Sequence, residues 1–202
     1  LGAAEVVVGE NFRFGHRARG DVRLLEQIGR TLSFGVIPLN LLTTDNAGQA
    51  VSSTMIRQLV AEGDVAAAAR ALARPHRVEG TVVSGDGRGT GLGFPTANLS
   101  MTPFPAVPAD GVYAGRIIVD PYGEHDVHSA AISIGTNPTF DDVVDHRVEA
   151  WAYDGGQLDL YDRPLAIDFA ARIRDQIKFS SEDELAAAVA QDAVAIRQVL
   201  GE

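Results

Sequence analysis

The chain has 202 residues, of which 46% are hydrophobic and 22% charged, a balance typical of a globular protein with a buried core. Its formal net charge of −10 argues against general binding to nucleic acid, because such binding depends on Lys and Arg that meet phosphates. No apolar run approaches the roughly 20 residues of a membrane span, no secretory signal is recognisable, and cysteine is absent, which excludes disulfides and thiolate metal sites. We therefore predict a cytoplasmic protein whose partners are small molecules, with no nucleic acid and no membrane, and the sequence leaves self-association open.

The first 75 residues have a mixed pattern that predicts short strands and helices. Two apolar runs predict strands: residues 6–8 and 36–39. Helix caps are expected at Asp21, at Ser52 or Ser53, and at Asp64. Gly63 is expected to end the second helix, and the alanine-rich third helix ends before Pro75. The first helix should turn four apolar side chains inward: Val22, Leu24, Leu25 and Ile28.

The pattern changes after residue 77, where turn residues separate five segments that predict strands: 78–83, 111–119, 130–134, 147–152 and 165–171. This spacing predicts a small antiparallel sheet or barrel. Ser181 and Glu184 form a capping box that opens a final helix. The expected apolar face of that helix consists of Leu185, Val189, Ile196 and either Val199 or Leu200. We accordingly predict two domains, residues 1–75 and 76–202.

A glycine-rich stretch, residues 85–98, contains the most informative pattern in the chain. Five glycines stand at alternate positions: Gly85, Gly87, Gly89, Gly91 and Gly93. Glycines weaken a strand, but they allow a backbone to fold tightly and to bring its N–H groups against a polyphosphate. Taken alone, the cluster favours a flexible surface hairpin, because glycine motifs are loosely defined.

The residues that follow the glycines favour a metal–nucleotide site. Pro95 fixes the backbone just before Thr96 and Asn98, whose side chains project to the same face of an extended segment. A hydroxyl and an amide carbonyl are hard oxygen ligands that suit Mg²⁺, with ATP phosphate oxygens and water completing its octahedron. The alternative is local hydrogen bonding in a turn. Coupled to the glycines, the metal interpretation is the better one, so we expect Mg²⁺ or another divalent cation together with ATP.

Residues 93–98, Gly-Phe-Pro-Thr-Ala-Asn, resemble the signature of riboflavin kinases in the form found in bacterial bifunctional FAD synthetases. The resemblance continues in order along the chain, at residues 111–114, 134–140, 148–149, 160–161 and 174–179. It therefore covers essentially all of residues 76–202, with one departure at Asp162, where the family usually has glycine. The resemblance implies a small antiparallel Greek-key barrel with a C-terminal helix, which phosphorylates riboflavin to FMN with ATP.

The resemblance also implies roles for individual residues. Thr96 and Asn98 would hold Mg²⁺–ATP, and the other ATP-binding residues would be Gly85, Gly87, Arg88, Gly89, Gly91, Gly93, Phe94 and Pro95. Glu149 matches the general base that takes the proton of the ribityl 5′-hydroxyl, although taken alone it favours a solvated strand residue. Flavin-binding residues would be Thr139, Arg174 and Lys178, for which a tight turn and solvated basic side chains are the alternatives.

The N-terminal part resembles the second half of the adenylyltransferase module of the same FAD synthetases, which joins AMP from ATP to FMN. The residues that carry this resemblance are Asn11, Phe12, Arg13, Phe14, Gly15, Ser52, Ser53, Thr54 and Arg57. Free N–H groups at a helix start attract phosphate, while a plain helix cap is the alternative. The family's first strand and His-containing phosphate motif have no counterpart before Val6. Residues 1–75 are therefore expected to be an α/β remnant of a Rossmann-like nucleotidyltransferase domain, N-terminally truncated, which makes FAD poorly.

Two other functions remain open at this point. A fully bifunctional FAD synthetase would make FAD from FMN and ATP. A non-catalytic flavin-binding β-barrel would need neither metal ligands nor a base, so the joint presence of Thr96, Asn98 and Glu149 counts against it.

Overall fold

The computed structural model of the chain describes residues 2–43, 50–85, 94–101, 106–135, 147–153 and 158–202, apart from the side chain of Glu182. The chain forms two compact units, Leu1–Ser52 and Ser53–Glu202. Within the described residues, no helix is long and apolar enough to cross a membrane.

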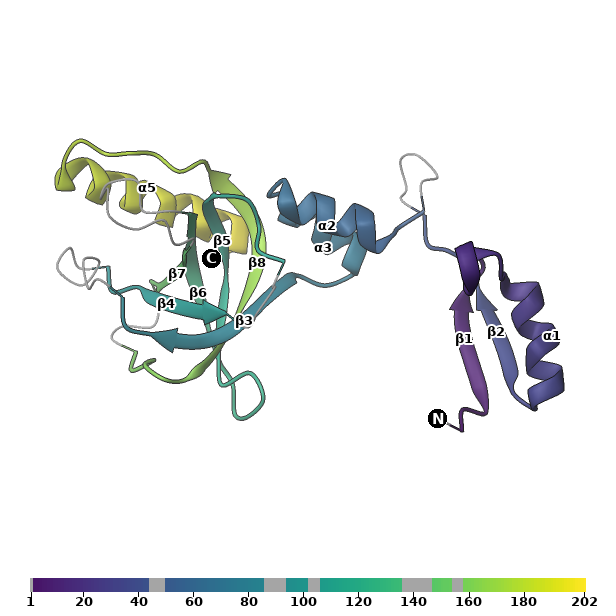
Figure 1. Ribbon diagram of the computed structural model, residues 1–202. Helices are drawn as coiled ribbons and strands as arrows, with labels where there is room; N and C mark the ends of the chain where they lie inside the picture. Colours follow the sequence, from purple (N-terminus) through teal and green to yellow (C-terminus); the bar gives the residue numbers. More distant parts are fainter. Residues whose placement is uncertain (1, 44–49, 86–93, 102–105, 136–146, 154–157) are drawn as a thin grey trace. The chain divides into compact units, whose positions relative to one another are not determined.

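The first unit is a strand–helix–strand unit with a parallel pair of strands. β1 (Glu5–Gly9) pairs with β2 (Gly35–Leu39), and α1 (Val22–Leu32) connects them after a short 3-10 turn, η1 (His16–Ala18) (Figure 1). Asp21 caps α1 as predicted, since its Oδ1 accepts a hydrogen bond from the Leu24 N–H at 2.9 Å. These strands confirm the two predicted from the apolar runs.

One expected member of the buried face of α1 is wrong. Leu24 is 42% exposed, whereas Val22, Leu25 and Ile28 are half-buried. Successive residues of an α-helix are rotated by about 100°, so Leu24 lies on a different side of the helix from Val22 and Leu25. The buried face of α1 is therefore narrower than predicted and does not include Leu24.

A helical hairpin opens the second unit. α2 (Ser53–Ala61) ends near Gly63, which has a φ of +79°, and α3 (Val65–Leu72) begins after Asp64, whose Oδ1 accepts from the Ala67 N–H at 2.9 Å. These ends and the Asp64 cap confirm the sequence prediction. The hairpin belongs to the same compact unit as the strands that follow it, and the domain boundary after residue 75 stays a prediction.

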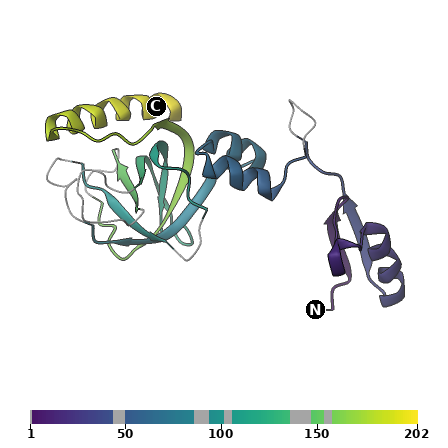
Figure 2. The same ribbon diagram turned by 45° about the horizontal axis from the view of Figure 1, so that its top comes forward.

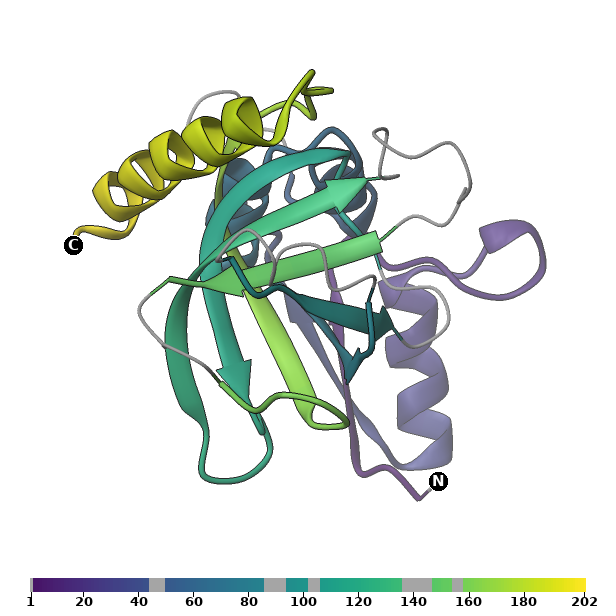
Figure 3. The same ribbon diagram turned by 90° about the vertical axis from the view of Figure 1, so that its left-hand side faces the viewer.

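Six antiparallel strands close into a barrel in the order β3–β4–β7–β6–β5–β8. Their bounds are β3 (His76–Val83), β4 (Ala97–Met101), β5 (Gly111–Val119), β6 (Asp126–Gly135), β7 (Arg147–Ala152) and β8 (Pro164–Arg174). β5, β6 and β7 follow one another as neighbours and β8 returns beside β5, which is a Greek key (Figure 3). The predicted barrel is confirmed, and β4 is a strand that the apolar pattern did not predict.

The core of the second unit lies inside the barrel. Its largest fully buried side chains are Tyr113, Phe169, Ile117, Ile132, Ile134, Leu165 and Ile167. Because strand residues alternate between the two faces, every second residue of the strands points outward, away from this core.

α5 (Glu182–Leu200) covers the outside of the barrel over β5, β6 and β8 (Figures 1 and 2). Ser181 caps it by accepting from the Glu184 N–H at 3.2 Å, and the Glu184 carboxylate accepts from the Ser180 N–H at 3.0 Å. Ile196 is fully buried. Of the two alternatives for the last apolar position, Leu200 is half-buried and Val199 is 46% exposed, so Leu200 belongs to the buried face. Asp192, which lies on the inward face, was not predicted there and is only 7% exposed.

Asp162 explains the one departure from the family motif. Its φ of +60° lies in the left-handed region, which glycine adopts without cost and which Asp tolerates better than most residues. The turn that a glycine would form is therefore formed here by Asp162.

Candidate active site on the outer face of the barrel

Asn98 and Glu149 are direct partners on adjacent strands. Asn98 of β4 is paired with Glu149 of β7 and with Val83 of β3, and Glu149 is also paired with Ser133 of β6. The residues beside them in the two strands, Ala97, Leu99, Val148 and Ala150, are buried in the barrel core. Asn98 and Glu149 therefore point outward, on one face, at the separation of about 5 Å between side chains that is typical of cross-strand pairs. A predicted metal ligand and the predicted base are thus brought together by the barrel.

Thr96 lies just before β4 and is half-buried. Continuing the register of Ala97 with Ala150 by one residue sets Thr96 opposite Trp151. Phe94, two residues earlier, packs edge-on against the Trp151 ring with a centroid distance of 4.9 Å. Thr96 therefore lies between an aromatic contact and Asn98, at the end of the glycine-rich stretch.

The first glycine of that stretch packs against Asn98. A Cβ at Gly85 would overlap the Asn98 amide and lie 2.6 Å from Asn98 Cγ, so a larger residue would displace the side chain that the metal hypothesis uses. This close contact is a physical reason for glycine at position 85. The other predicted members of the stretch, Gly87, Arg88, Gly89, Gly91 and Gly93, lie outside the described residues.

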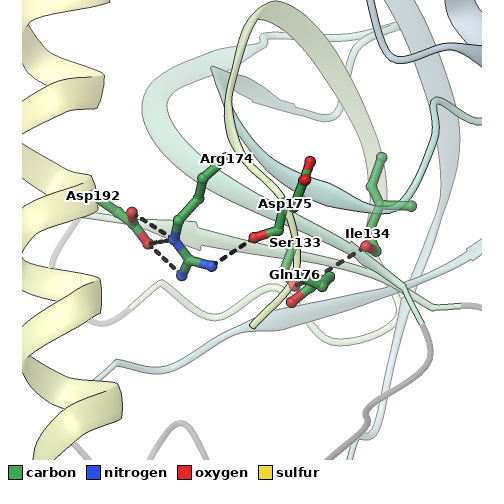
Figure 4. Close-up of polar contacts among 6 residues, drawn as sticks. All are labelled: Ser133, Ile134, Arg174, Asp175, Gln176 and Asp192. Atoms are coloured by element: carbon green, nitrogen blue, oxygen red, sulfur yellow. Dashed lines mark hydrogen bonds and ion pairs between the residues drawn. The ribbon is translucent and has the colours of Figure 1, made fainter. Parts of the chain in front are cut away.

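The same row of paired strand residues continues to the predicted flavin segment. Ser133 is paired with Val112 of β5, and Val112 with Arg174 at the end of β8. Figure 4 shows that the Arg174 side chain reaches α5, where Asp192 accepts from Nε at 2.9 Å and from Nη2 at 2.8 Å. Lys178 is exposed, and Thr139 lies outside the described residues. Arg174 thus lies in the row of the candidate site, with its charge held by Asp192.

The residues present fit a Mg²⁺ ion that is bound mainly by its nucleotide. Within the described residues, no group of three or more His, Asp or Glu side chains lies together as a metal cage. Mg²⁺ bound with ATP needs only one or two protein oxygens, because phosphate oxygens and water supply the others. The Thr96 hydroxyl and the Asn98 amide oxygen form a donor set of this size.

Two groups of the barrel with structural roles have perturbed pKa values. Burial raises the pKa of Tyr113, whose hydroxyl donates to the Ala109 carbonyl. Burial also lowers the pKa of His76, whose Nε2 lies 2.7 Å from the Ala106 carbonyl oxygen. Sequence reasoning did not identify these groups, because their burial follows from closure of the barrel.

A hollow of about 580 Å³ lies on another part of the barrel wall. It is lined by Arg74, Pro75, Arg77, Val78, Glu79, Ala106 and Asp168. The Arg77 guanidinium donates to Asp168 at 2.7 and 2.8 Å, so its charge is neutralised within the wall. The hollow shares no residue with the Asn98–Glu149 pair.

The residues that resemble an adenylyltransferase are divided between the two units. In the first unit Phe12 stacks on Phe14 at 5.8 Å and Arg13 lies 3.7 Å from Asp21; Asn11 and Gly15 belong to the same loop. Ser52 ends that unit, whereas Ser53, Thr54 and Arg57 lie on α2 of the second. The helix was predicted to be capped by Ser52 or Ser53, and α2 begins at Ser53, which agrees with that position.

Comparison with known proteins shows two matches along the chain. Residues 72–200 match the family model described as riboflavin kinase, and residues 1–55 match the model described as FAD synthetase. The bifunctional riboflavin kinase/FMN adenylyltransferase of Escherichia coli K12 is 34% identical over 97% of the chain, and that of Pseudomonas fluorescens is 33% identical over 98%. The chain spans 60% of the length of the first relative and 61% of the second.

A solved structure also matches most of the chain. A crystal structure described as a macrolide-efflux protein from Streptococcus pneumoniae has a TM-score of 0.81 and 30% identity, over 96% of this chain and 60% of that one. Its description differs from those of the curated relatives, and its backbone supports the same fold.

Proposed function

This chain belongs to the riboflavin kinase family, and we propose that it transfers the γ-phosphate of ATP to the ribityl 5′-hydroxyl of riboflavin, giving FMN and ADP. The observation that carries the proposal is the pairing of Asn98 with Glu149, which sets a hard oxygen donor beside a carboxylate on one outward face. A flavin-binding barrel without catalysis would require neither group.

Glu149 acts as the general base in the proposed reaction. Its carboxylate takes the proton of the 5′-hydroxyl while that oxygen forms its bond to the γ-phosphorus. The bond between the γ-phosphorus and the β,γ-bridging oxygen breaks, and ADP leaves with the electron pair. Thr96 and Asn98 would hold Mg²⁺, which when bound offsets the negative charge of the phosphates.

The glycine-rich stretch would bind the polyphosphate of ATP. Its first residue, Gly85, packs on Asn98, so the stretch begins beside the proposed metal ligand. We assign the flavin to Thr139, Arg174 and Lys178, of which Arg174 lies in the same row of paired strand residues as Glu149. Lys178 is exposed, while Arg174 is already paired with Asp192, so Lys178 is the better candidate for a direct contact.

Adenylyl transfer from ATP to FMN is a second candidate, favoured by the match of residues 1–55 to FAD synthetase. We propose it as an activity of the longer bifunctional proteins that this chain resembles, to which Asn11–Gly15, Ser52–Thr54 and Arg57 would contribute. Both reactions use ATP and small molecules, so we also propose a cytoplasmic location without nucleic-acid or membrane partners.

The first experiment is incubation of the purified chain with riboflavin, ATP and Mg²⁺, followed by chromatographic separation of riboflavin, FMN and FAD. We expect FMN, and we expect its formation to stop when the divalent cation is chelated. FAD in addition to FMN would support the second candidate. Riboflavin binding without any FMN would contradict the kinase proposal and favour the binding module.

Glu149→Gln tests the assigned base. The amide keeps the size of the side chain but cannot accept the proton, so kcat should fall by roughly 10²–10⁴ with substrate affinity largely kept. Glu124→Gln is the matched control, because it makes the same change at an exposed position between β5 and β6, at the opposite end of β6 from Ser133. Unchanged turnover of a folded Glu149→Gln variant would remove Glu149 from the mechanism.

A further inference from the structure

Gln176 makes a two-point contact with β6 through its side-chain amide. Nε2 donates to Ser133 Oγ at 2.8 Å and to the Ile134 carbonyl oxygen at 3.0 Å. A carbonyl oxygen can only accept, so the contact with Ile134 fixes which end of the amide is nitrogen. The orientation of Oε1 is therefore fixed as well.

This contact lies next to the proposed base. Ser133 is the β6 partner of Glu149, and Gly135, which ends β6, would meet Gln176 Cγ at 3.2 Å if it carried a Cβ. Gly135 also has a φ of +156°, in a region that side chains rarely adopt. Gln176 is thus packed closely against the last residues of β6, one strand away from Glu149.

The two neighbours of Asp175 turn in opposite directions. Arg174 points to α5 and binds Asp192, while Gln176 points to β6, as Figure 4 shows. Arg174 Nη1 also donates to the Asp175 carbonyl oxygen at 2.9 Å. The chain is thereby held on both sides of Asp175, and Gln176 is the side chain that turns toward the row of Glu149.

Resting on the proposed kinase function, we propose that Gln176 binds riboflavin by accepting a hydrogen bond from a flavin N–H or ribityl hydroxyl at Oε1. Among the described residues Oε1 has no partner, whereas both hydrogens of Nε2 are used by Ser133 and Ile134. Because the side chain is already held in one orientation, little further conformational entropy is lost when a ligand binds to Oε1. The row then runs from the metal ligand on β4, through the base on β7, to the flavin acceptor beside β6.

Gln176→Leu tests this assignment, because leucine has a similar size but no acceptor. We expect the riboflavin Kd, measured without ATP by flavin fluorescence, and the riboflavin KM to rise about threefold to tenfold, the value of one net hydrogen bond. The KM for ATP should stay near that of the unmodified chain, whereas the melting temperature should fall by a few degrees, because Ser133 and Ile134 lose their donor. Gln191→Leu, an exposed position on α5, is the matched control.

Ser133→Ala separates positioning from structural support. Ser133 would act only through Gln176, so Ser133→Ala should raise the riboflavin Kd by about twofold to threefold and add nothing to Gln176→Leu. If Gln176→Leu does not fold, Ser133→Ala tests the proposal by itself. An unchanged riboflavin Kd of Ser133→Ala then overturns the proposal. Equal losses of affinity for riboflavin and for ATP also overturn it, since they indicate a structural role. Absence of FMN formation by the unmodified chain would refute the kinase function. The riboflavin Kd of Gln176→Leu would still test whether Gln176 binds riboflavin.

Discussion

Asp192 determines the orientation of Arg174. Its carboxylate is nearly buried on the inward face of α5 and accepts from both Nε and Nη2 of the guanidinium, a forked geometry that suits Arg. Arg174 also stacks over the Phe179 ring at 5.7 Å. These contacts make Arg174 an anchor for α5, which competes with its predicted contact to the flavin.

Asp192→Ala should lower the free energy of unfolding by about 3 kcal/mol, because removing one partner leaves a half-buried guanidinium uncompensated. Replacing both Arg174 and Asp192 by leucine should recover most of this loss. Chemical denaturation measures both effects, with the exposed Asp183→Ala on the same helix as control. A stable Asp192→Ala variant with tighter riboflavin binding would instead support the flavin role of Arg174.

At the residue scale, some features of the candidate site could be inferred from the sequence and others could not. The sequence predicted that Thr96 and Asn98 lie on the same face, because side chains two residues apart in an extended segment point the same way. Their proximity to Glu149 could not be predicted from the sequence, since it depends on the register of β4 against β7. A signal for Asp192 did exist: helical spacing from Val189 to Ile196 passes through position 192, and an acid there needs a cationic partner.

The helical hairpin is fixed to the barrel at Gly63. A Cβ at this position would meet Tyr113 Oη at 2.7 Å and Arg172 Cδ at 3.3 Å. Val65 and Ala68 of α3 are fully buried, and α3 contacts β3 and β8. The turn between α2 and α3 therefore lies directly on the barrel wall.

Gly63→Ala should destabilise the second unit by about 2–3 kcal/mol, from the cost of a positive φ together with the contact to Tyr113. Gly201→Ala provides the control, because Gly201 has a φ of +77° and no atom within 4 Å of the added Cβ. That variant should lose only about 1 kcal/mol. Equal losses in thermal unfolding would show that the Tyr113 contact contributes nothing.

At the element scale, strands with β-branched runs were predicted well and β4 was not. β5 and β7 have the predicted bounds, and β3, β6 and β8 extend theirs by a few residues. β4 has the sequence Ala-Asn-Leu-Ser-Met, which has no β-branched residue and a low strand propensity. Pairing with β3 and β7 makes it a strand, so tertiary contacts outweigh local preference.

At the scale of the whole molecule, the compact units divide between Ser52 and Ser53, upstream of the predicted boundary. A chain that begins at Ser53 should fold cooperatively and keep FMN formation, because Val60, Val65 and Ala68 stay covered. A chain that begins at His76 uncovers the barrel wall under α3 and should melt at a lower temperature. Calorimetry of the two chains distinguishes the boundaries, and equal melting temperatures would favour the one at residue 75.

The closure of the barrel has a consequence for biosynthesis. β1 pairs with β2 after one short helical crossover. β3 can pair with β8 only after the rest of the barrel has been synthesised, because His76 of β3 is the partner of Phe169 in β8. Until β8 leaves the ribosome, β3 and β5 each lack one neighbour and expose an unpaired edge. Sequence-distant pairing of this kind slows folding, so the nascent barrel passes through an interval in which its unpaired edges are open to aggregation.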